Sequence, residues 1–423
     1  MRPNPQQLKS AVFFEKGKPP AQQPYFGADA ELYLTPEYLR GKEASEPCKA
    51  NTNAVRVIDG DTIVLWDGSN AGEVFKARGG VLSSTMTLLK IRGSFDREYF
   101  FYAVKNLEPI LKGQTAGSGI PHVDKEVLGN LTILEFQEPE QIKIAEVLSL
   151  LDKAIEQTEA LIAKQNRVRS GLTRDFFTRG IDKCGNLRSE RSHAFQDSAL
   201  GRVPIEWQVL ELGKSAIELI DGDRGEHYPK QNELLEDGAC LFLTAKNVTN
   251  AGFKFGERQF VSASKDEMLG AGKLERFDIV LTTRGTVGNF AWYDVDVPYE
   301  NIRINSGMII LRNRDPQLLP QFIFESLRGF IYDFEFRRVI SGSAQPQLPV
   351  RDLRAFHIVR VPIDEQKLIL SRINQFNEMA KLTEERHAKL CLLKDALTQD
   401  LLTGRKRVKA LLDDKPKREG AYA

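Results

Sequence analysis

The sequence predicts an α+β protein in which two similar mixed α/β domains are each followed by a long helix, with the two helices paired. Three observations lead to this prediction. One segment recurs after 225 residues, that segment carries a heptad pattern, and short β-branched segments separated by turn residues precede it in both halves. The expected molecule therefore has pseudo-twofold symmetry.

The recurring segment spans 117–178 and aligns with 342–403 without a gap. Sixteen positions are identical, among them the pair Glu-Gln at 140–141 and 365–366. The segments close on similar phrases, "GLTRDFFTRG" and "ALTQDLLTGR". Because the period is as long as a whole domain, it indicates domain duplication and not a short-repeat solenoid.

The recurring segment predicts two long helices, over 139–180 and 362–405. Apolar residues follow alternating steps of four and three, which is typical of a helix that packs along a partner helix. About 36 residues at 1.5 Å rise give a rod of roughly 54 Å. Narrow seams with charged flanks favour pairing of the two helices over the alternative, in which each helix packs on its own domain. The seam residues are Ile144, Leu148, Leu151, Ile155, Ile162, Ile369, Ile373, Phe376 and Leu390.

Three polar residues, Thr158, Thr383 and Gln165, also fall on these seams, where polar groups fix the register of paired helices. The two closing phrases end in apolar pairs, 176–177 and 401–402. We expect each pair to seal its helix against the domain of the opposite half.

Residues 1–138 and 204–361 predict two mixed α/β domains dominated by short strands. Strand segments include "TIVLW" and "MTLLKI" in the first domain and "DIVLTT" and "GMIILRN" in the second. Short helices are expected over 97–107 and 320–334. The polar residues 181–203 predict an extended linker, and 406–423 a polar tail.

Basic and amide side chains on the loops of both domains suggest contacts with nucleic acid, because these groups bind phosphates and base edges. The alternative for each of them is simple solvation of the surface. The candidate set is Arg40, Lys42, Lys76, Arg78, Arg224, Lys230, Lys246, Asn247, Arg284, Arg337, Arg338, Ser343 and Gln345.

The composition is that of an ordinary globular chain, with 41% hydrophobic and 28% charged residues among 423. The net charge of +1 excludes a uniformly basic shell but allows local basic patches. The four cysteines are scattered, which predicts free thiols and no metal site. We expect a cytoplasmic protein, because neither a membrane-length apolar run nor a signal sequence is present.

The sequence contains no recognisable catalytic set. The closest candidate is Asp364, Glu365 and Lys367, which are the residue types of a metal-dependent nuclease. All three fall within one turn at the start of a predicted helix, where acidic residues complement the helix dipole. The first copy, "EPEQIK", has no Asp. Both observations favour a structural role.

Several motifs in this order resemble the specificity (S) subunit of type I restriction–modification systems. They are "DSALGRVPIEWQVLELG" (197–213), "DIVLTTRGTVGN", "GSAQPQLPVRDLRAFHIVRVPIDEQKLI" (342–369) and the two helix-ending phrases. The resemblance covers nearly the whole chain. It implies two target-recognition domains, each reading one half of a split double-stranded DNA sequence, separated by an antiparallel coiled coil.

The resemblance also implies that the chain is non-catalytic and scaffolds two methyltransferase subunits and motor–nuclease subunits. The chain itself would hold no cofactor, whereas its partners would use S-adenosylmethionine, ATP and Mg²⁺. The rod of roughly 54 Å would then bound the separation of the half-sites at about one to two DNA turns. Two alternatives stay open: a nuclease using Asp364, Glu365 and Lys367, and a coiled-coil scaffold that does not bind DNA.

The first domain departs from the pattern at its N-terminus. The residues 205–210 that open the second domain have no visible counterpart in the first, and 8–20 align roughly with 212–223. Either the first domain is shortened at its N-terminus, or its opening strand is supplied in another way.

Overall fold

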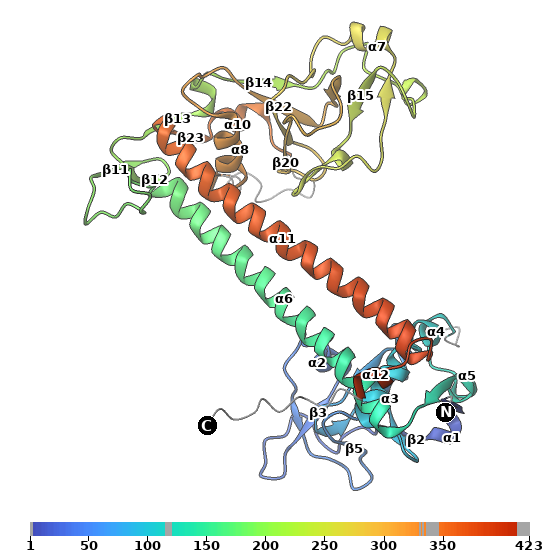
Figure 1. Cartoon of the computed structure of the whole chain (residues 1–423). Helices are drawn as coiled ribbons and strands as arrows, with labels where there is room; N and C mark the ends of the chain where they lie inside the picture. The colour runs from blue at the N-terminus through green and yellow to red at the C-terminus, as the bar shows by residue number, and fades with distance from the viewer. Residues whose placement is uncertain (1–2, 115–120, 330, 332–333, 336–346, 413–423) are drawn as a thin grey trace, which may run out of the picture. The chain divides into compact units, whose positions relative to one another are not determined.

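The computed structural model describes residues 3–114, 121–329, 331, 334–335 and 347–412. The chain divides into two compact units, of which unit 1 contains 1–160 and 384–423 and unit 2 contains 161–383. Each unit therefore combines one mixed α/β domain with one end of each long helix (Figure 1).

Unit 1 is built on an antiparallel sheet with the strand order β2-β9-β6-β7. A second sheet has the order β4-β3-β8-β5, in which β3 and β8 are parallel, and β1 pairs with β10. The strands are β1 (Asn4–Gln7), β2 (Val12–Lys16), β3 (Glu31–Leu34), β4 (Pro47–Cys48), β5 (Arg56–Val57), β6 (Thr62–Leu65), β7 (Val74–Lys76), β8 (Gly80–Leu82), β9 (Met86–Ile91) and β10 (Thr132–Glu135). The short helices are α1 (Leu8–Ala11), α2 (Pro36–Leu39), α3 (Arg97–Lys105), α4 (Glu108–Gly113), α5 (Lys125–Asn130) and α12 (Lys409–Leu412).

Unit 2 repeats this arrangement. Its main sheet has the order β14-β22-β19-β20, its second sheet the order β18-β15-β21 with β15 parallel to β21, and β13 pairs with β23. The strands are β11 (Phe195–Ser198), β12 (Gly201–Pro204), β13 (Gln208–Glu211), β14 (Ile217–Asp221), β15 (Cys240–Leu243), β16 (Val248–Thr249), β17 (Gly252–Phe253), β18 (Phe260–Val261), β19 (Ile279–Thr282), β20 (Phe290–Trp292), β21 (Ile302–Ile304), β22 (Met308–Asn313) and β23 (His357–Arg360). The helices are η1 (Leu212–Lys214), η2 (Gln231–Glu233), η3 (Ala245–Asn247), α7 (Ala263–Met268), α8 (Pro320–Arg328) and α10 (Val350–Arg354).

The strand registers match between the two units. Leu65 of β6 lies opposite Met86, and Thr282 of β19 lies opposite Met308, so the two central strand pairs superpose position by position. Helices α3 and α8 follow the equivalent strands β9 and β22. The predicted duplication and the two predicted short helices are confirmed, although α8 ends at Arg328.

The strand that opens the second domain does have a counterpart in the first domain, which corrects the absence inferred from the sequence. Strand β1 pairs antiparallel with β10, with Asn4 opposite Glu135, just as β13 pairs with β23, with Gln208 opposite Arg360. The polar sequence "NPQQ" conceals this strand because only one of its four residues is even half-buried.

The long helices are α6 (Glu138–Thr178), with 41 residues, and α11 (Ile363–Leu402), with 40. They run antiparallel within each unit (Figure 1). In unit 1, Lys394 pairs with Asp152 at 2.5 Å. In unit 2, Gln165 donates a hydrogen bond to the Thr383 hydroxyl at 3.1 Å. Two of the polar seam residues thus bond to each other across the helix pair, which confirms the predicted pairing.

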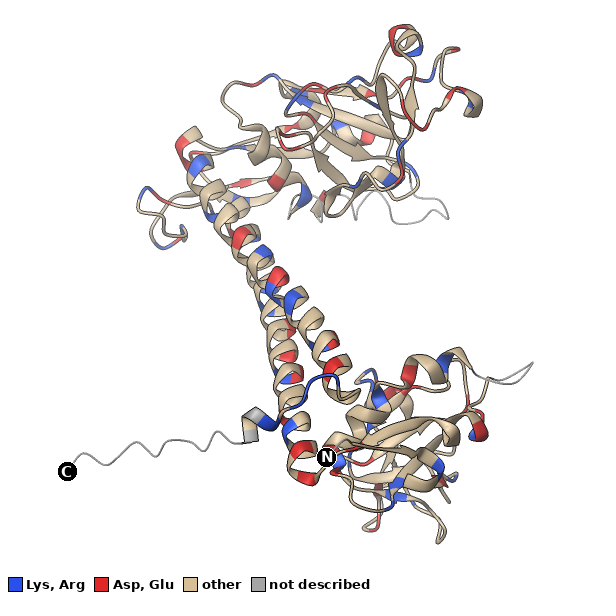
Figure 2. Cartoon of the chain, turned by 45° about the vertical axis from the view of Figure 1, so that its right-hand side comes forward, with Lys and Arg blue, Asp and Glu red and all other residues tan. Residues whose placement is uncertain are grey.

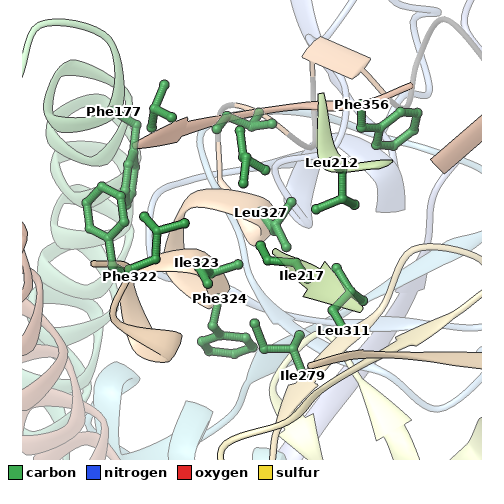
Figure 3. Close-up of a cluster of buried hydrophobic side chains, with 14 of the residues drawn as sticks. Phe177, Leu212, Ile217, Ile279, Leu311, Phe322, Ile323, Phe324, Leu327 and Phe356 are labelled. Carbon is green, nitrogen blue, oxygen red and sulfur yellow. The ribbon is translucent and has the colours of Figure 1, made fainter. Parts of the chain in front are cut away.

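The ends of the long helices are buried in the domain cores. Phe176 and Phe177 of α6 belong to the core of unit 2, where the Phe177 and Phe322 rings lie 5.1 Å apart between centroids (Figure 3). Leu401 and Leu402 of α11 belong to the core of unit 1. Each long helix therefore starts in one domain and ends with an apolar pair that is buried in the core of the other, as predicted.

The residues 181–203 form a folded part of unit 2, so the predicted extended linker is wrong. Strands β11 and β12 make a hairpin, and Ile181, Leu200 and Val203 are buried in the unit 2 core. The predicted polar tail also begins inside the fold, because Val408 is buried in the unit 1 core. Both segments are polar overall, and a few buried apolar residues attach each of them to the domain core.

Candidate nucleic-acid interface

In unit 2, several turns meet at one end of the main sheet. The backbone amides of Thr283 and Arg284 both donate to the Gly307 carbonyl, at 2.8 and 3.2 Å. Arg284 also forms an antiparallel bridge with Gln347. A Cβ on Gly222 would lie only 2.1 Å from the Asn305 carbonyl oxygen, so glycine permits this close approach. We call residues 222–224, 245–246, 283–288, 305–307 and 347 the unit 2 loop cluster.

Three of the predicted cations lie in this cluster. Arg224 is held by Asp221 at 3.0 Å and by the Ser306 carbonyl at 3.3 Å. Lys246 is 72% exposed in its ion pair with Glu257, and the neighbouring Ala245 faces Gly285 of the cluster. Arg284 is exposed. The sheet therefore brings together cations that lie far apart in the sequence.

Unit 1 contains the same backbone arrangement with other side chains. The amides of Trp66 and Asp67 both donate to the Thr85 carbonyl, at 2.7 and 3.2 Å, and Asp67 forms an antiparallel bridge with His122. A Cβ on Gly17 would lie 2.0 Å from the Ser83 carbonyl oxygen. We call residues 17–19, 35–38, 66–72, 83–85 and 122 the unit 1 loop cluster.

None of the cations predicted in the first domain belongs to the unit 1 loop cluster, although Arg40 and Arg78 contact its residues Glu37 and Tyr38. Arg40 is mostly buried and forms ion pairs with Glu73 and Glu37, and the hydrogen bond to Glu73 raises the pKa of Arg40. Because the Arg40 side chain is mostly buried in these ion pairs, the prediction that it is exposed is wrong. Lys42 is exposed, with no ion pair to the residues that the structure describes.

Lys76 and Arg78 lie at the opposite end of β6 and β7. Lys76 pairs with Glu98 at 2.5 Å, and Arg78 lies over the Tyr38 ring with 5.6 Å between its guanidinium carbon and the ring centroid. Both residues line a shallow pocket that also includes Gly60.

Asn247 is buried, so the prediction that it is exposed is also wrong. Its side chain accepts from the Thr244 amide and donates to the Lys254 and Glu257 carbonyls, which fixes the η3 turn. Lys230 is exposed at the start of η2, a helix that is tied to α7 through the Lys265–Glu233 ion pair. Neither residue belongs to the loop cluster. Four further predicted residues lie outside the described residues: Arg337, Arg338, Ser343 and Gln345.

The predicted seam residues divide into two groups. Ile144, Leu148, Ile369 and Ile373 are buried at the starts of α6 and α11, inside the domain cores. The remaining five are half-buried along the helices: Leu151, Ile155, Ile162, Phe376 and Leu390. The start of each long helix is therefore part of a domain core, and the middle is a helix pair.

The repeated Glu-Gln pair anchors the start of each long helix. Glu365 accepts hydrogen bonds from Arg188 through both of its oxygens, from the Ile181 amide at 2.9 Å and from the Trp207 indole at 3.2 Å. In unit 1, Arg407 donates to both oxygens of Glu140, at 2.6 and 2.5 Å, and this hydrogen bonding lowers the pKa of Glu140.

The glutamines next to these acids play matching roles. Gln141 donates to the Ser94 and Phe136 carbonyls and accepts from the Asp96 amide. Gln366 donates to the Gln317 and Val361 carbonyls and accepts from the Leu319 amide. Each glutamine thereby ties the start of a long helix to the segment before α3 or α8.

These contacts argue against the nuclease alternative. Both oxygens of Glu365 are already occupied by Arg188, Trp207 and the Ile181 amide, so no lone pair is free to face a metal ion. Asp364 is 89% exposed and forms a surface ion pair with Lys367, at 3.4 Å. Within the described ranges, no group of three or more His, Cys, Asp or Glu side chains is arranged to hold a metal. All four cysteines are free thiols.

Comparisons with known proteins agree with this architecture. The family model for the type I restriction modification DNA specificity domain matches residues 13–165 and 204–391. The type I restriction enzyme MjaVIII specificity subunit of Methanocaldococcus jannaschii is 31% identical over 418 residues, covering 95% of this chain and 92% of that subunit. The MjaIX specificity subunit of the same organism is 23% identical over 319 residues, covering 74% of this chain and 69% of its own.

Two solved structures share the fold. The S subunit of a type I restriction–modification system from M. genitalium has a TM-score of 0.58 and 16% identity, with 95% of this chain and 99% of that chain covered. A chain from a structural study of complex assembly and conformational transition in the type I R-M system has a TM-score of 0.58 and 15% identity, with 95% and 97% covered.

Among the residues that the structure describes, no helix is both long and apolar enough to cross a bilayer. The family model covers most of the chain, and the MjaVIII relative aligns over nearly its whole length. The chain therefore belongs to the type I restriction–modification DNA specificity family, as a non-catalytic specificity subunit that recognises the DNA target.

Proposed function

We propose that the chain reads a bipartite double-stranded DNA target, with one half read by each unit. The observation that carries this proposal is the repeated loop cluster: the same backbone hydrogen bonds occur at Thr283 and Arg284 in unit 2 and at Trp66 and Asp67 in unit 1, under different side chains. A backbone arrangement shared by both units, with different side chains on it, suits two domains that dock on DNA alike but read different bases.

The distribution of charge supports local contact over general attraction to DNA. Lys and Arg are interspersed with Asp and Glu over both units (Figure 2), and the whole chain has a net charge of only +1. Phosphate binding then depends on particular residues such as Lys246 and Arg284, and base-edge contacts must supply the selectivity.

We further propose that the long helices bind two methyltransferase subunits and, through the assembled complex, motor–nuclease subunits. Supporting this, α6 and α11 expose large apolar side chains in the parts of the helices that lie outside the domain cores, including Leu150 and Leu392 in unit 1 and Leu382 in unit 2. In unit 2, a groove of about 810 Å³ is lined by Leu319, Leu370 and Met379 together with polar residues of α11. Large apolar side chains left exposed next to such a groove are typical of protein contact sites. S-adenosylmethionine, ATP and Mg²⁺ would be bound by these partners.

Gel-shift assays on a random-sequence duplex pool test the DNA proposal, with the chain alone and with a co-expressed methyltransferase subunit. We expect selection of a two-block sequence. Methyltransferase binding without any DNA selectivity would contradict the proposal and support the non-DNA-binding scaffold. DNA cutting by the purified chain with Mg²⁺ alone, abolished by Glu365→Ala, would instead support the nuclease.

A further inference from the structure

Equivalent positions in and next to the two loop clusters carry opposite charges. Arg284 and Asp67 are matched by their backbone hydrogen bonds, and Asp221 and Lys16, which directly precede the clusters, are matched by the strand registers. Lys246 and Glu37 each lie three residues after the end of the matched strands β15 and β3. The same backbone frame therefore carries side chains of opposite charge in the two units.

The pair Arg284 and Asp67 is the most closely matched. Each residue donates its backbone N–H to the carbonyl that precedes the central strand, Gly307 or Thr85, with the same 3.2 Å distance. Each also bridges to the residue that enters the cluster from the segment before the long helix, Gln347 or His122. Arg284 and Asp67 therefore occupy equivalent backbone positions in the two units.

A general role in binding phosphate does not fit this position. A residue that held the DNA backbone in both units would have to be cationic or neutral in both, because a carboxylate repels phosphate. Asp67 is a carboxylate, whereas Arg284 is a guanidinium. Base edges, by contrast, differ between half-sites and include both acceptors and donors.

Both side chains are available for contact. Arg284 is exposed, and no ion pair joins it to any residue in the described part of the chain. Asp67 is 34% exposed and pairs with Lys16 at 2.7 Å, while Lys16 is itself 50% exposed. Exposed ion pairs of this kind stabilise a fold by at most about 1 kcal/mol, so a base edge can replace the Lys16 contact.

We propose that Arg284 and Asp67 are equivalent base-reading residues of the two units. Arg284 reads guanine, whose O6 and N7 accept two hydrogen bonds from a guanidinium. Asp67 reads a base that presents an amino group in the major groove, cytosine or adenine, because a carboxylate can only accept. This inference rests on the proposed recognition of a bipartite DNA target.

The test uses the full chain with a co-expressed methyltransferase subunit, a pool of randomised DNA duplexes, and sequencing of the bound fraction. The variants are Arg284→Ala, Arg284→Gln and Asp67→Ala. Arg314→Ala is the matched control, because Arg314 is a half-exposed arginine at the opposite end of strand β22. Circular dichroism melting confirms that each variant is folded.

We expect Arg284→Ala to lose preference for one guanine in one half-site, by roughly 5- to 150-fold, with the other half-site unchanged. Asp67→Ala loses preference at one position of the opposite half-site, and Arg314→Ala changes neither. Failure of the wild-type chain to select any two-block sequence would contradict the proposed function itself. Wild-type selection with unchanged preferences in both variants would overturn only the reading roles.

Two further outcomes also decide the question. Uniformly weaker binding by Arg284→Ala, with the same preferred sequence, would show a phosphate contact and overturn the inference. If the alanine variant binds no DNA, Arg284→Gln decides, because a glutamine amide matches the N6 and N7 of adenine and not the two acceptors of guanine. Loss of the guanine preference in the glutamine variant supports the inference, and its retention contradicts it.

Discussion

Arg407 donates two hydrogen bonds to Glu140, so the segment after the second long helix closes onto the first turn of the first long helix within unit 1. Arg188 makes the matching contact with Glu365 in unit 2. In both cases the carboxylate is buried, and its partner arrives from the chain that follows the opposite helix. Each unit is therefore completed by residues far away in the sequence.

We predict that Arg407→Ala destabilises unit 1 by about 3–5 kcal/mol, because it leaves the Glu140 carboxylate buried without its cation. Hydrogen exchange of unit 1 amides and chemical denaturation measure this change. The control is Lys406→Ala, since Lys406 is 70% exposed and pairs only at the surface, with Asp400. Equal stability of the two variants would show that the Arg407 contact is unimportant.

Glu365→Ala should destabilise unit 2 by a similar amount, because Arg188 and the Trp207 indole lose their shared acceptor. Asp364→Ala, one residue away on the exposed side of the helix, should change the free energy of unfolding by less than about 0.5 kcal/mol. Thermal unfolding of both variants distinguishes this anchor role from a metal-binding role. Stabilisation of the wild type by Mg²⁺ that is lost in both variants would favour the metal site.

The sequence predicted the parts of the molecule that repeat. The heptads, the closing phrases and the strand segments all recur, so their pairing and burial follow from periodicity. The anchors at Glu140 and Glu365 were visible as identities, but their partners were not. Arg188 and Arg407 stand in segments with no shared pattern, and only the fold brings them to equivalent places.

The candidate contact residues were less predictable, because a residue type does not reveal which polar side chains form hydrogen bonds inside the fold and which remain exposed. The side chains of Arg40 and Asn247 both form internal hydrogen bonds. Asp67 was missed because the search favoured basic side chains. Aligning "GDTIVLWDG" (60–68) with "FDIVLTTRG" (277–285) places Asp67 opposite Arg284, and that alignment is the signal that could have found it.

The stability of unit 2 should depend on pH through Asp266. Burial alone would raise the pKa of this carboxyl, but hydrogen bonds from Lys273, Arg303 and Asn301 lower it from 3.8 to about 2. Because the folded pKa is the lower one, the stabilisation is fully present above about pH 4 and disappears as the pH falls through 2.

The measurement compares urea unfolding of the wild type and Asp266→Asn between pH 5 and pH 2. We expect the difference in unfolding free energy to shrink by about 2 kcal/mol over that range. Asp364→Asn is the control, because Asp364 is 89% exposed. A difference that stays constant with pH would contradict the assignment to Asp266.

Phe277 is the single non-glycine residue with a positive φ in the described part of the chain, with φ at 72°. Its counterpart in unit 1 is Gly60, with φ at 87°: the Phe277 amide donates to the Tyr293 carbonyl just as the Gly60 amide donates to the Ala77 carbonyl. A side chain in this region is strained by its Cβ, and glycine is not.

Phe277→Gly should therefore be more stable than Phe277→Ala by about 1 kcal/mol, although alanine is normally the more favourable residue. Both variants remove the same half-exposed ring and its contact with Trp292, so the difference isolates the backbone strain. Chemical denaturation of unit 2 measures it. If the alanine variant proved equally or more stable, the backbone at this turn would have to relax to negative φ, and the strain would not be a property of the native fold.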